Sequence, residues 1–377
     1  MKIFIISRGI PTEKFPLNGI FEFDQAKALS AENINVTMLV IDFRSRTYKR
    51  KYGCFHYVKD KVNVFELSLP LGIYRKALPL LQCCLTFLYN KAVKKLGKPD
   101  VIHTHFYFIA AISSCLKKKK IPFVITEHSS KLNKNIKEIS ALDQNLARKA
   151  YQGATTIIAV SKELSQRLEN NFNVNTVVIN NMIDCECFTF CKRLPKKDFT
   201  FISVGNLVSS KGFQVLIEAF SKSFDIQEDI YLNIIGAGEE KESMKQLILD
   251  NGRSRQIQLL GQKNREDIGN LMCNSDAFVL ASFSETFGIS YVEAMMSGLP
   301  VIATRCGGPE SFVNDSNGIL INPNDVDALS KALIFMYKNA KYYDSFSISE
   351  QSKANFSSHN IAEKLIKLYQ SMEDKKI

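Results

Sequence analysis

The sequence has no tryptophan among its 377 residues, and no run of about 18 apolar residues, the length that a membrane-spanning helix needs. We therefore predict that no segment crosses a membrane. The first apolar run, Ile3 to Ile6, is too short for a signal peptide, and no small-residue cleavage site follows it. We expect a cytoplasmic protein of two domains, since domains average roughly 150 residues.

Metal-binding patterns are absent too. The nine cysteines include the adjacent Cys83 and Cys84 and the group Cys185, Cys187 and Cys191, and none has the CxxC spacing of a zinc site. An odd number of cysteines without an export signal predicts reduced thiols that act as packing residues. No DxD pair of aspartates occurs near the motifs described below, so we predict no metal and no other cofactor.

Acidic residues are scarce in the first half. Residues 1–190 contain 28 Lys and Arg against 15 Asp and Glu, whereas residues 191–377 contain 21 against 23. A basic half favours an anionic partner such as nucleic acid, acidic lipid or a phosphorylated substrate, although a solvated lysine-rich surface gives the same count. Without zinc-finger spacing or an RNP-type aromatic motif, we do not expect nucleic acid.

Short apolar runs rich in β-branched residues alternate with helical patterns along most of the chain. Such runs are typical of strands buried on both faces of a parallel sheet, and the alternation predicts a doubly wound α/β fold. The pattern restarts after 188–198, a stretch with four Lys or Arg and one proline. We predict a first domain over 1–187, a linker over 188–198, a second domain over 199–356 and a C-terminal helix within 357–377.

One segment, 73–96, departs from this scheme because basic residues flank its leucine-rich centre. Those residues are Arg75, Lys76, Lys91, Lys94 and Lys95. A basic amphipathic helix can lie in a membrane interface. A core helix whose lysines solvate one end fits the same pattern, and both interpretations stay open.

The strongest functional signal lies in residues 284–310. Glu285 would lie in a loop after an apolar strand, and Glu293 on the helix that follows. Between them, Gly288 would let backbone N–H groups at a helix N-terminus approach a phosphate. A carboxylate on each side could accept hydrogen bonds from sugar hydroxyls. This segment therefore predicts a site for a phosphorylated sugar or nucleotide.

Two further patterns support that site. Lys211 comes just before a helix in the segment 204–212, where a cation suits a diphosphate. Three of the five histidines, His103, His105 and His128, follow strands, and such positions line the ligand crevice of a parallel sheet. The segment GAGE (236–239) lacks the third glycine of a dinucleotide fingerprint, which disfavours an NAD-dependent oxidoreductase.

With these motifs the chain resembles the family-4 retaining glycosyltransferases, which have the GT-B architecture of two facing Rossmann-like domains. The resemblance covers nearly the whole chain. In the second half it rests on VGNLVSSKGF (204–213), IIGAGEE (234–240), SETFGISYVEAMMSGLPVIAT (284–304) and GGPE (307–310). In the first half it rests on PLNGIFEFDQAKAL (16–29), DVIHTHF (100–106), VITEHSS (124–130) and AVSKEL (159–164).

The resemblance implies a role for each matching residue. Residues expected to bind the donor are Gly19, Asn206, Lys211, Glu285, Phe287, Gly288, Ile289 and Glu293. Residues expected on the acceptor side are His105, Glu127 and His128. Of these, His128 and Glu285 would be catalytic. The family often has an arginine in place of Asn206, which leaves Lys211 as the principal cation unless Arg8 or Arg305 substitutes.

The resemblance predicts a retaining, metal-independent glycosyltransferase. It would transfer a sugar from a nucleotide-sugar donor, a UDP- or GDP-sugar, to a glycan or lipid-linked acceptor in cell-surface polysaccharide biosynthesis, such as capsule or lipopolysaccharide. Segment 73–96 would hold it peripherally on an anionic membrane surface, and the C-terminal helix would cross back to the first domain. The alternatives are a sugar-nucleotide epimerase of the same architecture and a non-catalytic binding subunit.

Overall fold

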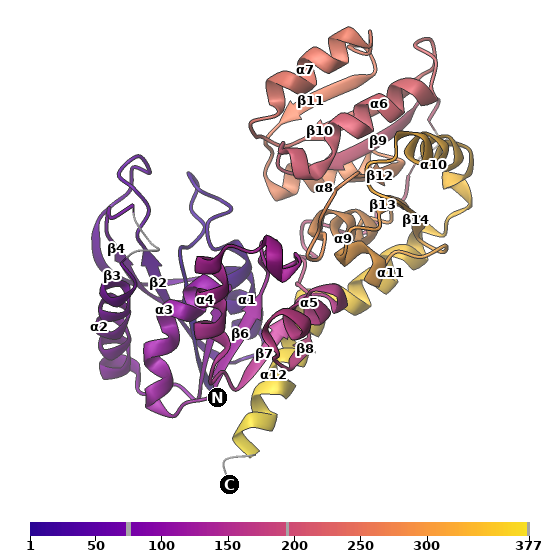
Figure 1. Ribbon diagram of the computed structural model, residues 1–377. Coiled ribbons are helices and arrows are strands. Elements are labelled where there is room, and N and C mark those ends of the chain that lie inside the picture. Colours follow the sequence, from indigo (N-terminus) through magenta and orange to yellow (C-terminus); the bar gives the residue numbers. More distant parts are fainter. Residues whose placement is uncertain (73–76, 194–195, 375–377) are drawn as a thin grey trace. The chain divides into compact units, whose positions relative to one another are not determined.

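The computed structural model describes residues 1–72, 77–193 and 196–374, and the chain divides into two units (Figure 1). Unit 1 comprises Met1–Met182 together with Ser358–Ile377, and unit 2 comprises Ile183–Ser357. Each unit is built around its own β-sheet with helices between the strands, as the alternating sequence pattern predicts.

Unit 1 contains an eight-stranded sheet in the order β3-β4-β2-β1-β5-β6-β7-β8. Its strands are β1 (Lys2–Ser7), β2 (Asn35–Asp42), β3 (Gly53–Lys59), β4 (Val62–Ser68), β5 (Val101–His105), β6 (Phe123–Glu127), β7 (Thr156–Ala159) and β8 (Thr176–Val178). All pair in parallel except β3. The central strands β1, β5 and β6 are almost wholly buried, because helices cover both of their faces.

The β3–β4 hairpin is the departure from the parallel sheet that the sequence predicts. Lys59 pairs with Val62, and the two turn residues, Asp60 and Lys61, both have positive φ. Two-residue hairpin turns of this kind usually have Gly as the second residue, after Asn, Asp or Gly, whereas Lys61 occupies that position here. The sequence therefore carried only a weak turn signal for this hairpin, Asp60.

The helices of unit 1 are α1 (Ile20–Ala31), α2 (Leu78–Leu96), α3 (Tyr107–Ser113), α4 (Ala141–Tyr151), α5 (Lys162–Phe172) and α12 (Ser358–Asp374). The last of these comes from the far end of the chain, yet it belongs to unit 1 (Figure 1). Ile361, Leu365 and Tyr369 of α12 are buried in the same core as Phe23 and Leu29 of α1. The apolar period of the C-terminal segment thus contributes directly to the core of unit 1.

Unit 2 contains a six-stranded, wholly parallel sheet in the order β11-β10-β9-β12-β13-β14. Its strands are β9 (Phe199–Val204), β10 (Ile230–Ile235), β11 (Ile257–Gly261), β12 (Ala277–Val279), β13 (Val301–Thr304) and β14 (Gly318–Ile321). Its helices are α6 (Phe213–Ser223), α7 (Lys241–Asp250), α8 (Arg265–Cys273), α9 (Ile289–Met296), α10 (Val326–Asn339) and α11 (Ser345–Phe356).

Both sheets have a point where the strand order reverses. In unit 1 the reversal lies between β1 and β5, and in unit 2 between β9 and β12. At such a point the loops that follow the two strands turn to opposite faces of the sheet, which opens a crevice beyond the carboxyl ends of the strands. The fold therefore offers each unit one natural ligand site, formed by the loops after those strands.

The segment expected to be a linker is largely packed on unit 2. Phe188 is buried, and the Arg193 guanidinium donates to the carbonyl oxygens of Ser275, Ser297 and Gly298 at 2.7–3.0 Å. Cys191 forms a disulfide with Cys273 at the end of α8, across a Cα–Cα distance of 5.3 Å. The expectation that all nine cysteines are free thiols is wrong for this pair, since 82 residues separate the two in the sequence and folding brings them together.

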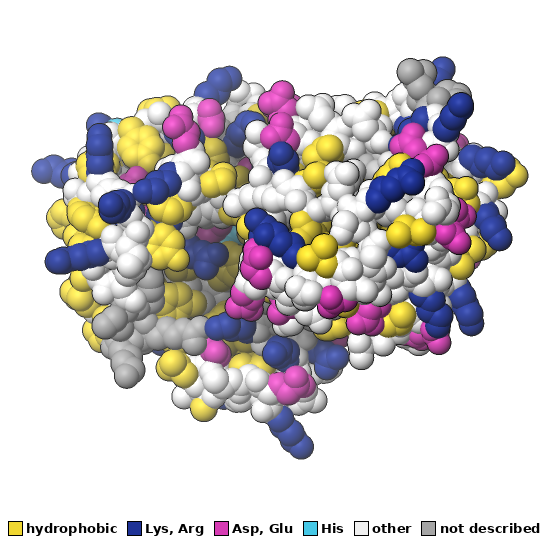
Figure 2. All heavy atoms as spheres, turned by 90° about the horizontal axis from the view of Figure 1, so that it is seen from above, with side chains coloured by type: hydrophobic (Ala, Val, Ile, Leu, Met, Phe, Trp, Pro, Cys, Tyr) yellow, Lys and Arg dark blue, Asp and Glu magenta, His cyan; other side chains and the backbone are white. Residues whose placement is uncertain are grey.

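The amphipathic segment forms α2, which begins at Leu78, so its first basic residues, within 73–76, lie outside the described residues. Leu81, Leu85 and Leu88 are buried, whereas Leu80 and Phe87 are 50% and 55% exposed. None of the described helices is long and apolar enough to span a membrane. On the face shown in Figure 2, the described Lys and Arg side chains are scattered among acidic ones rather than gathered into one stripe.

Candidate active site

In unit 2, the loops after β9 and β12 bring Lys211 and Glu285 together. Lys211 Nζ lies 2.5 Å from Glu285 Oε1, and Ser282 Oγ donates to the same carboxylate oxygen at 2.9 Å. The Lys211 and Glu285 side chains are 22% and 10% exposed, so the pair is mostly desolvated but remains accessible to a ligand. The two residues singled out from separate motifs therefore meet where the strand order reverses.

Close backbone packing fixes the two loops. Gly212 has φ +64°, and a Cβ there would lie 2.0 Å from the Ala281 carbonyl oxygen, so no other residue fits without displacing the backbone. On the other side, Glu285 N–H donates to Cys306 O and Gly308 N–H donates to Glu285 O, both at 3.0 Å. Glu285 is thus held by its backbone as well as by Lys211.

The other predicted donor residues of unit 2 lie in the loops after β9 and β12 or on α9. Gly288 has φ +95° and begins α9, with half-buried Ile289 as the first helical residue. Phe287 is buried and packs against Phe312 and Phe356, with ring centroids 5.4 and 5.5 Å away. Glu293 is a mostly buried residue of α9, and Asn206 is exposed in the loop after β9.

In unit 1, residues that follow β1, β2, β5 and β6 line a cavity of about 450 Å³ that is open to solvent on one side. Its lining includes Arg8, Asn18, Arg44, Phe106, His128 and Lys131. This volume falls within the usual range for small-molecule sites. Of the predicted acceptor-side residues, His128 lines the cavity, whereas His105 does not. His103 and His105 are buried residues of β5 itself, so the prediction that they follow the strand is wrong.

Glu127 holds the loop that carries His128. Its two carboxylate oxygens accept hydrogen bonds from the backbone N–H groups of Tyr107, His128 and Ser129 at 2.8–3.0 Å, and from Tyr151 Oη at 2.9 Å. Burial raises the pKa of Glu127 to about 7, against the hydrogen bonds, which lower it. Glu127 is fully buried, so in this structure it positions the loop and does not face the cavity.

Three buried imidazoles form a row that leads inward from the cavity. His128 Nε2 lies 2.8 Å from His105 Nδ1, and the His105 ring lies nearly parallel to that of His103, with centroids 4.9 Å apart. At the inner end, His103 contacts Tyr369 Oη of α12 at 2.6 Å. Burial lowers the pKa of His103 and of His128 to about 3 and that of His105 well below its usual value. All three are therefore neutral at physiological pH.

Gly19, the last residue of the loop between β1 and α1, packs against the start of the same loop. It has φ +71°, and a Cβ there would lie 2.1 Å from the Gly9 carbonyl oxygen. Glycine therefore lets α1 start against the loop after β1. Glu22, in the first turn of α1, is buried, and burial raises its pKa although a backbone hydrogen bond and the charge of Arg8 lower it.

The structure adds residues to the cavity that the sequence did not reveal. Arg44 follows β2 and Lys131 follows β6, and neither belongs to a motif, whereas Phe106 is the last residue of the motif DVIHTHF (100–106) but was not singled out. Phe106 has φ +62°, which is strained for a bulky residue and which typically occurs at functional sites. The one signal in the sequence that could have identified these residues as cavity lining is that each follows a strand. Among the described residues, no group of three or more His, Cys, Asp or Glu could hold a metal ion.

In a comparison with known protein families, each half of the chain matches a glycosyltransferase family model. Residues 189–353 match the family model described as Glycosyl transferases group 1, and residues 23–187 match the model described as Glycosyltransferase Family 4. Together the two models cover most of the chain. The chain belongs to the family-4 glycosyltransferases.

Relatives and solved structures agree with this. The glycosyltransferase is 31% identical to the uncharacterized glycosyltransferase MJ1178 of Methanocaldococcus jannaschii, over 64% of this chain and 66% of that protein, slightly under two thirds of its length. It is 26% identical to a protein named for teichuronic acid biosynthesis, TuaC of Bacillus subtilis, over 88% of each chain. The structure of Anabaena Alr3699/HepE with UDP and glucose superimposes with a TM-score of 0.75 at 19% identity, covering 98% of this chain and 100% of that one.

These matches establish the GT-B fold that the sequence predicts. In the glycosyltransferase, the predicted donor residues lie in the unit matched by the group 1 model, except Gly19, which lies in unit 1. The predicted acceptor-side residues lie in the unit matched by the family 4 model. The assignment of each residue to donor or acceptor stays a prediction.

Proposed function

We propose that this glycosyltransferase transfers a sugar from a UDP- or GDP-sugar to a glycan or lipid-linked acceptor in cell-surface polysaccharide biosynthesis, with retention of the anomeric configuration. The observation that carries the proposal is the Lys211–Glu285 pair at the reversal point of the second sheet. The names of relatives such as TuaC support a role in polysaccharide synthesis, and the UDP held by Alr3699/HepE supports a uridine donor.

Transfer breaks the bond between the sugar's anomeric carbon and the diphosphate, so negative charge develops on the leaving diphosphate. In the proposal, Lys211 and the backbone N–H groups at the start of α9 stabilise this charge. No metal ion is needed for this role. Glu293 on α9 accepts hydrogen bonds from the ribose, and Gly288 lets the phosphates approach the helix end.

Glu285 has a different part in the proposal. Its carboxylate already accepts hydrogen bonds from Lys211 and Ser282, which fix its orientation before the donor arrives. It then accepts hydrogen bonds from hydroxyls of the donor sugar. A pre-oriented carboxylate loses little freedom on binding and therefore positions the sugar efficiently.

On the acceptor side, His128 is the residue proposed to meet the reacting groups, because it lines the cavity of unit 1. Its burial keeps the ring neutral, so it can accept a hydrogen bond from an acceptor hydroxyl. The acceptor oxygen bonds to the anomeric carbon on the face that the diphosphate leaves, and its proton passes to the leaving phosphate oxygen. NMR of the product's anomeric proton tests retention, and an inverted product would refute it.

A membrane-bound acceptor would require contact with the lipid surface, and α2 is the proposed contact. Leu80 and Phe87 are exposed on it, with Lys91, Lys94 and Lys95 near its C-terminal end. Cosedimentation with anionic vesicles should fall when Phe87 and Lys94 are replaced by Ser and Gln. Equal cosedimentation of wild type and variant would contradict this contact.

The donor site is tested by nucleotide binding and turnover. UDP-, GDP-, ADP- and CDP-sugars are titrated against wild type, Lys211→Ala and Glu285→Gln. A charge-assisted hydrogen bond contributes about 1.5–3 kcal/mol, so Lys211→Ala should weaken nucleotide binding about 10- to 100-fold. Glu285→Gln should reduce turnover more than it reduces binding of the free nucleoside diphosphate.

Lys222→Ala is the matched control. Lys222 lies in the same unit, is 59% exposed and forms an ion pair with Asp327 at 2.5 Å, as Lys211 does with Glu285. An exposed pair contributes little to stability, so nucleotide binding should be unchanged. Equal losses in Lys211→Ala and Lys222→Ala would refute the donor site. Release of an epimerised sugar without an acceptor would instead identify an epimerase.

A further inference from the structure

The cavity of unit 1 is positively charged. Arg8 follows β1, Arg44 follows β2 and Lys131 follows β6, so three cations from three loops line one space. Among the described residues that line the cavity, no carboxylate occurs. Three positive charges would repel one another around an apolar ligand, and an anionic group bound between them would relieve that repulsion.

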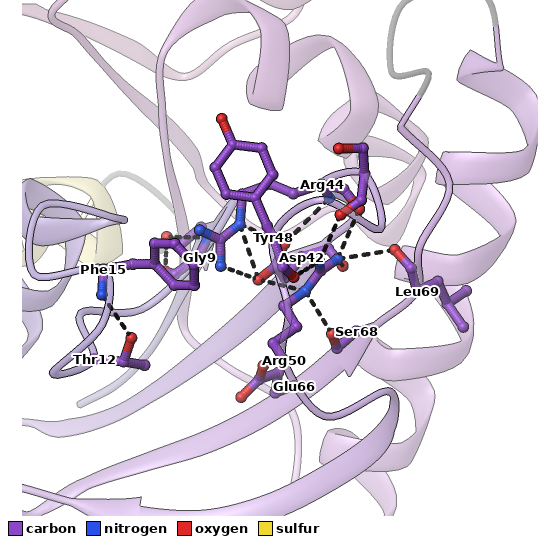
Figure 3. A network of polar contacts seen from close by, with 12 residues as sticks. Gly9, Thr12, Phe15, Asp42, Arg44, Tyr48, Arg50, Glu66, Ser68 and Leu69 are labelled. Atoms are coloured by element: carbon purple, nitrogen blue, oxygen red, sulfur yellow. Dashed lines mark hydrogen bonds and ion pairs between the residues drawn. The ribbon is translucent and has the colours of Figure 1, made fainter. Parts of the chain in front are cut away.

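Arg44 is held in place by a network of polar contacts that includes a second arginine and two carboxyl groups (Figure 3). Its Nε and Nη2 donate to the Asp42 carboxylate at 3.0 and 2.7 Å, and Arg50 Nε lies 3.1 Å from the same carboxylate. The Asp42 carboxylate is thus shared by two arginines, and a second carboxyl group, Glu66, interacts electrostatically with both of them. Arg44 therefore contributes a guanidinium held in a fixed position rather than a surplus positive charge. The Arg44 guanidinium also lies over the Phe15 ring, 4.4 Å from its centroid, which fixes the group at the cavity.

Aromatic residues form another part of the cavity lining. Phe106, Tyr107 and Phe108 start the segment after β5, and Phe106 is held there with φ +62°. The Arg8 guanidinium lies 5.1 Å from the centroid of the Phe106 ring. An aromatic surface packs against the apolar face of a sugar ring, while the adjacent guanidinium is placed to bind a charged substituent on that ring.

From this combination we infer that the acceptor is an anionic sugar, in which a carboxylate or phosphate on the sugar is bound by Arg8, Arg44 and Lys131. The inference rests on the proposed function, because it takes the cavity of unit 1 as the acceptor site. The side-chain nitrogen of Asn18, which has no hydrogen-bond partner among the described residues, adds a neutral donor to the lining. Guanidinium groups bind both carboxylates and phosphates through paired hydrogen bonds. The inference is therefore that the acceptor carries a negative charge, and the experiment below distinguishes a carboxylate from a phosphate.

The test compares three matched probes by calorimetric titration: methyl glucoside, methyl glucuronide and glucose 6-phosphate. The two anionic probes should bind at least about tenfold more tightly than the neutral one, since one charge-assisted contact is worth that much. The preference should shrink at high salt, which screens charges exposed to solvent. Whichever anionic probe binds more tightly identifies the carboxylate or the phosphate as the preferred group.

The variant Arg8→Gln/Lys131→Gln should remove most of the preference for anionic probes and leave UDP affinity unchanged. Arg44 is left intact because its ion pair with Asp42 supports the fold. Lys134→Gln is the control, since Lys134 is exposed near Lys131 in the chain but does not line the cavity. Equal binding of neutral and anionic probes, or no binding of either anionic probe at millimolar concentration, would overturn the inference.

A separate readout distinguishes failure of this inference from failure of the proposed function. If wild type binds no nucleotide, the proposed donor site is wrong whatever the probes show. If nucleotide binds normally and Arg8→Gln/Lys131→Gln weakens UDP as much as it weakens the anionic probes, these cations serve the donor diphosphate, and the inference about the acceptor is refuted.

Discussion

The row of buried imidazoles makes unit 1 sensitive to acid, and His103 allows this to be tested. Folding holds its pKa near 3, whereas the unfolded chain titrates near 6.5. Between these values the unfolded state binds one proton more than the folded state, so stability falls as pH falls below about 6.5. Removing this imidazole should therefore remove part of the acid sensitivity.

The size of the effect follows from linkage. For each buried neutral histidine, the free energy of unfolding falls by about 1.4 kcal/mol for each pH unit below about 6.5. At about pH 5, one such histidine therefore lowers it by about 2 kcal/mol. His128 adds a similar amount, since burial also holds its pKa near 3. Glu127 acts in the opposite direction: its pKa of about 7 lies above the unfolded value of 4.5, so it regains about 2 kcal/mol on acidification from about pH 7 to about pH 5. The net loss for these three groups is about 2 kcal/mol.

Comparing wild type with His103→Gln isolates one group, because the other contributions cancel in the difference. The free energy of unfolding is measured by urea titration at about pH 7 and about pH 5, followed by circular dichroism, since the chain has no tryptophan. The substitution itself changes the free energy of unfolding at about pH 7 by an amount that does not affect the comparison. On acidification, the free energy of unfolding of the variant should fall by about 2 kcal/mol less than that of wild type.

His359→Gln is the control for the histidine experiment. His359 is exposed and pairs with Glu32 at 2.6 Å, which raises its pKa. A raised pKa contributes stability that is present below about 6.5 and is lost as pH rises through the folded pKa, so this variant should lose more than wild type on acidification. If His103→Gln and wild type lose the same stability on acidification, His103 is not held neutral by folding and the reasoning is refuted.

Two further predictions concern packing. Gly308→Ala should destabilise unit 2 by about 3 kcal/mol, because its Cβ would lie 2.2 Å from the Phe287 carbonyl oxygen. The control Gly252→Ala, with open space around its Cβ, should cost only about 1 kcal/mol, and equal urea midpoints for the two would contradict this. Deletion of 358–377 should abolish cooperative unfolding of unit 1, since it removes the buried side chains of Leu365 and Tyr369; a full transition in calorimetry would refute it.

The sequence predicted what local patterns determine. Buried β-branched runs marked the central strands of both sheets, because a strand covered by helices on both faces must be apolar throughout. The β3–β4 hairpin was not predicted, because its Asp60-Lys61 turn lacks the glycine that usually follows Asp in such a turn. The Cys191–Cys273 disulfide was not predicted either, because only the fold brings together residues so distant in sequence.

Some residues of the candidate sites could likewise be predicted from the sequence, and others could not. Lys211 and Glu285 could be predicted to meet, because each follows a strand next to the reversal point of one sheet and each belongs to a motif. Arg44 and Lys131 could not, because each is an ordinary surface-type residue in the sequence. What makes them part of a site is the cavity that four loops form together, and loop conformation is not determined by any short pattern.

The structure also shows how some of the surplus Lys and Arg residues in the first half of the sequence are used. Part of the surplus serves the fold: Lys117 Nζ donates to the Ala150 carbonyl oxygen at 2.6 Å, Lys59 to that of Pro11 at 2.7 Å, and Arg50 to those of Asp42, Arg44 and Leu69 at 2.9–3.1 Å. Burial lowers the pKa of Lys117 to about 8, which fits a structural amine rather than a surface charge. A count of charges treats these residues and the cavity cations alike. The proposed recognition of an anion in unit 1 therefore depends on the loops around the cavity, and the net charge of the first half of the sequence overstates it.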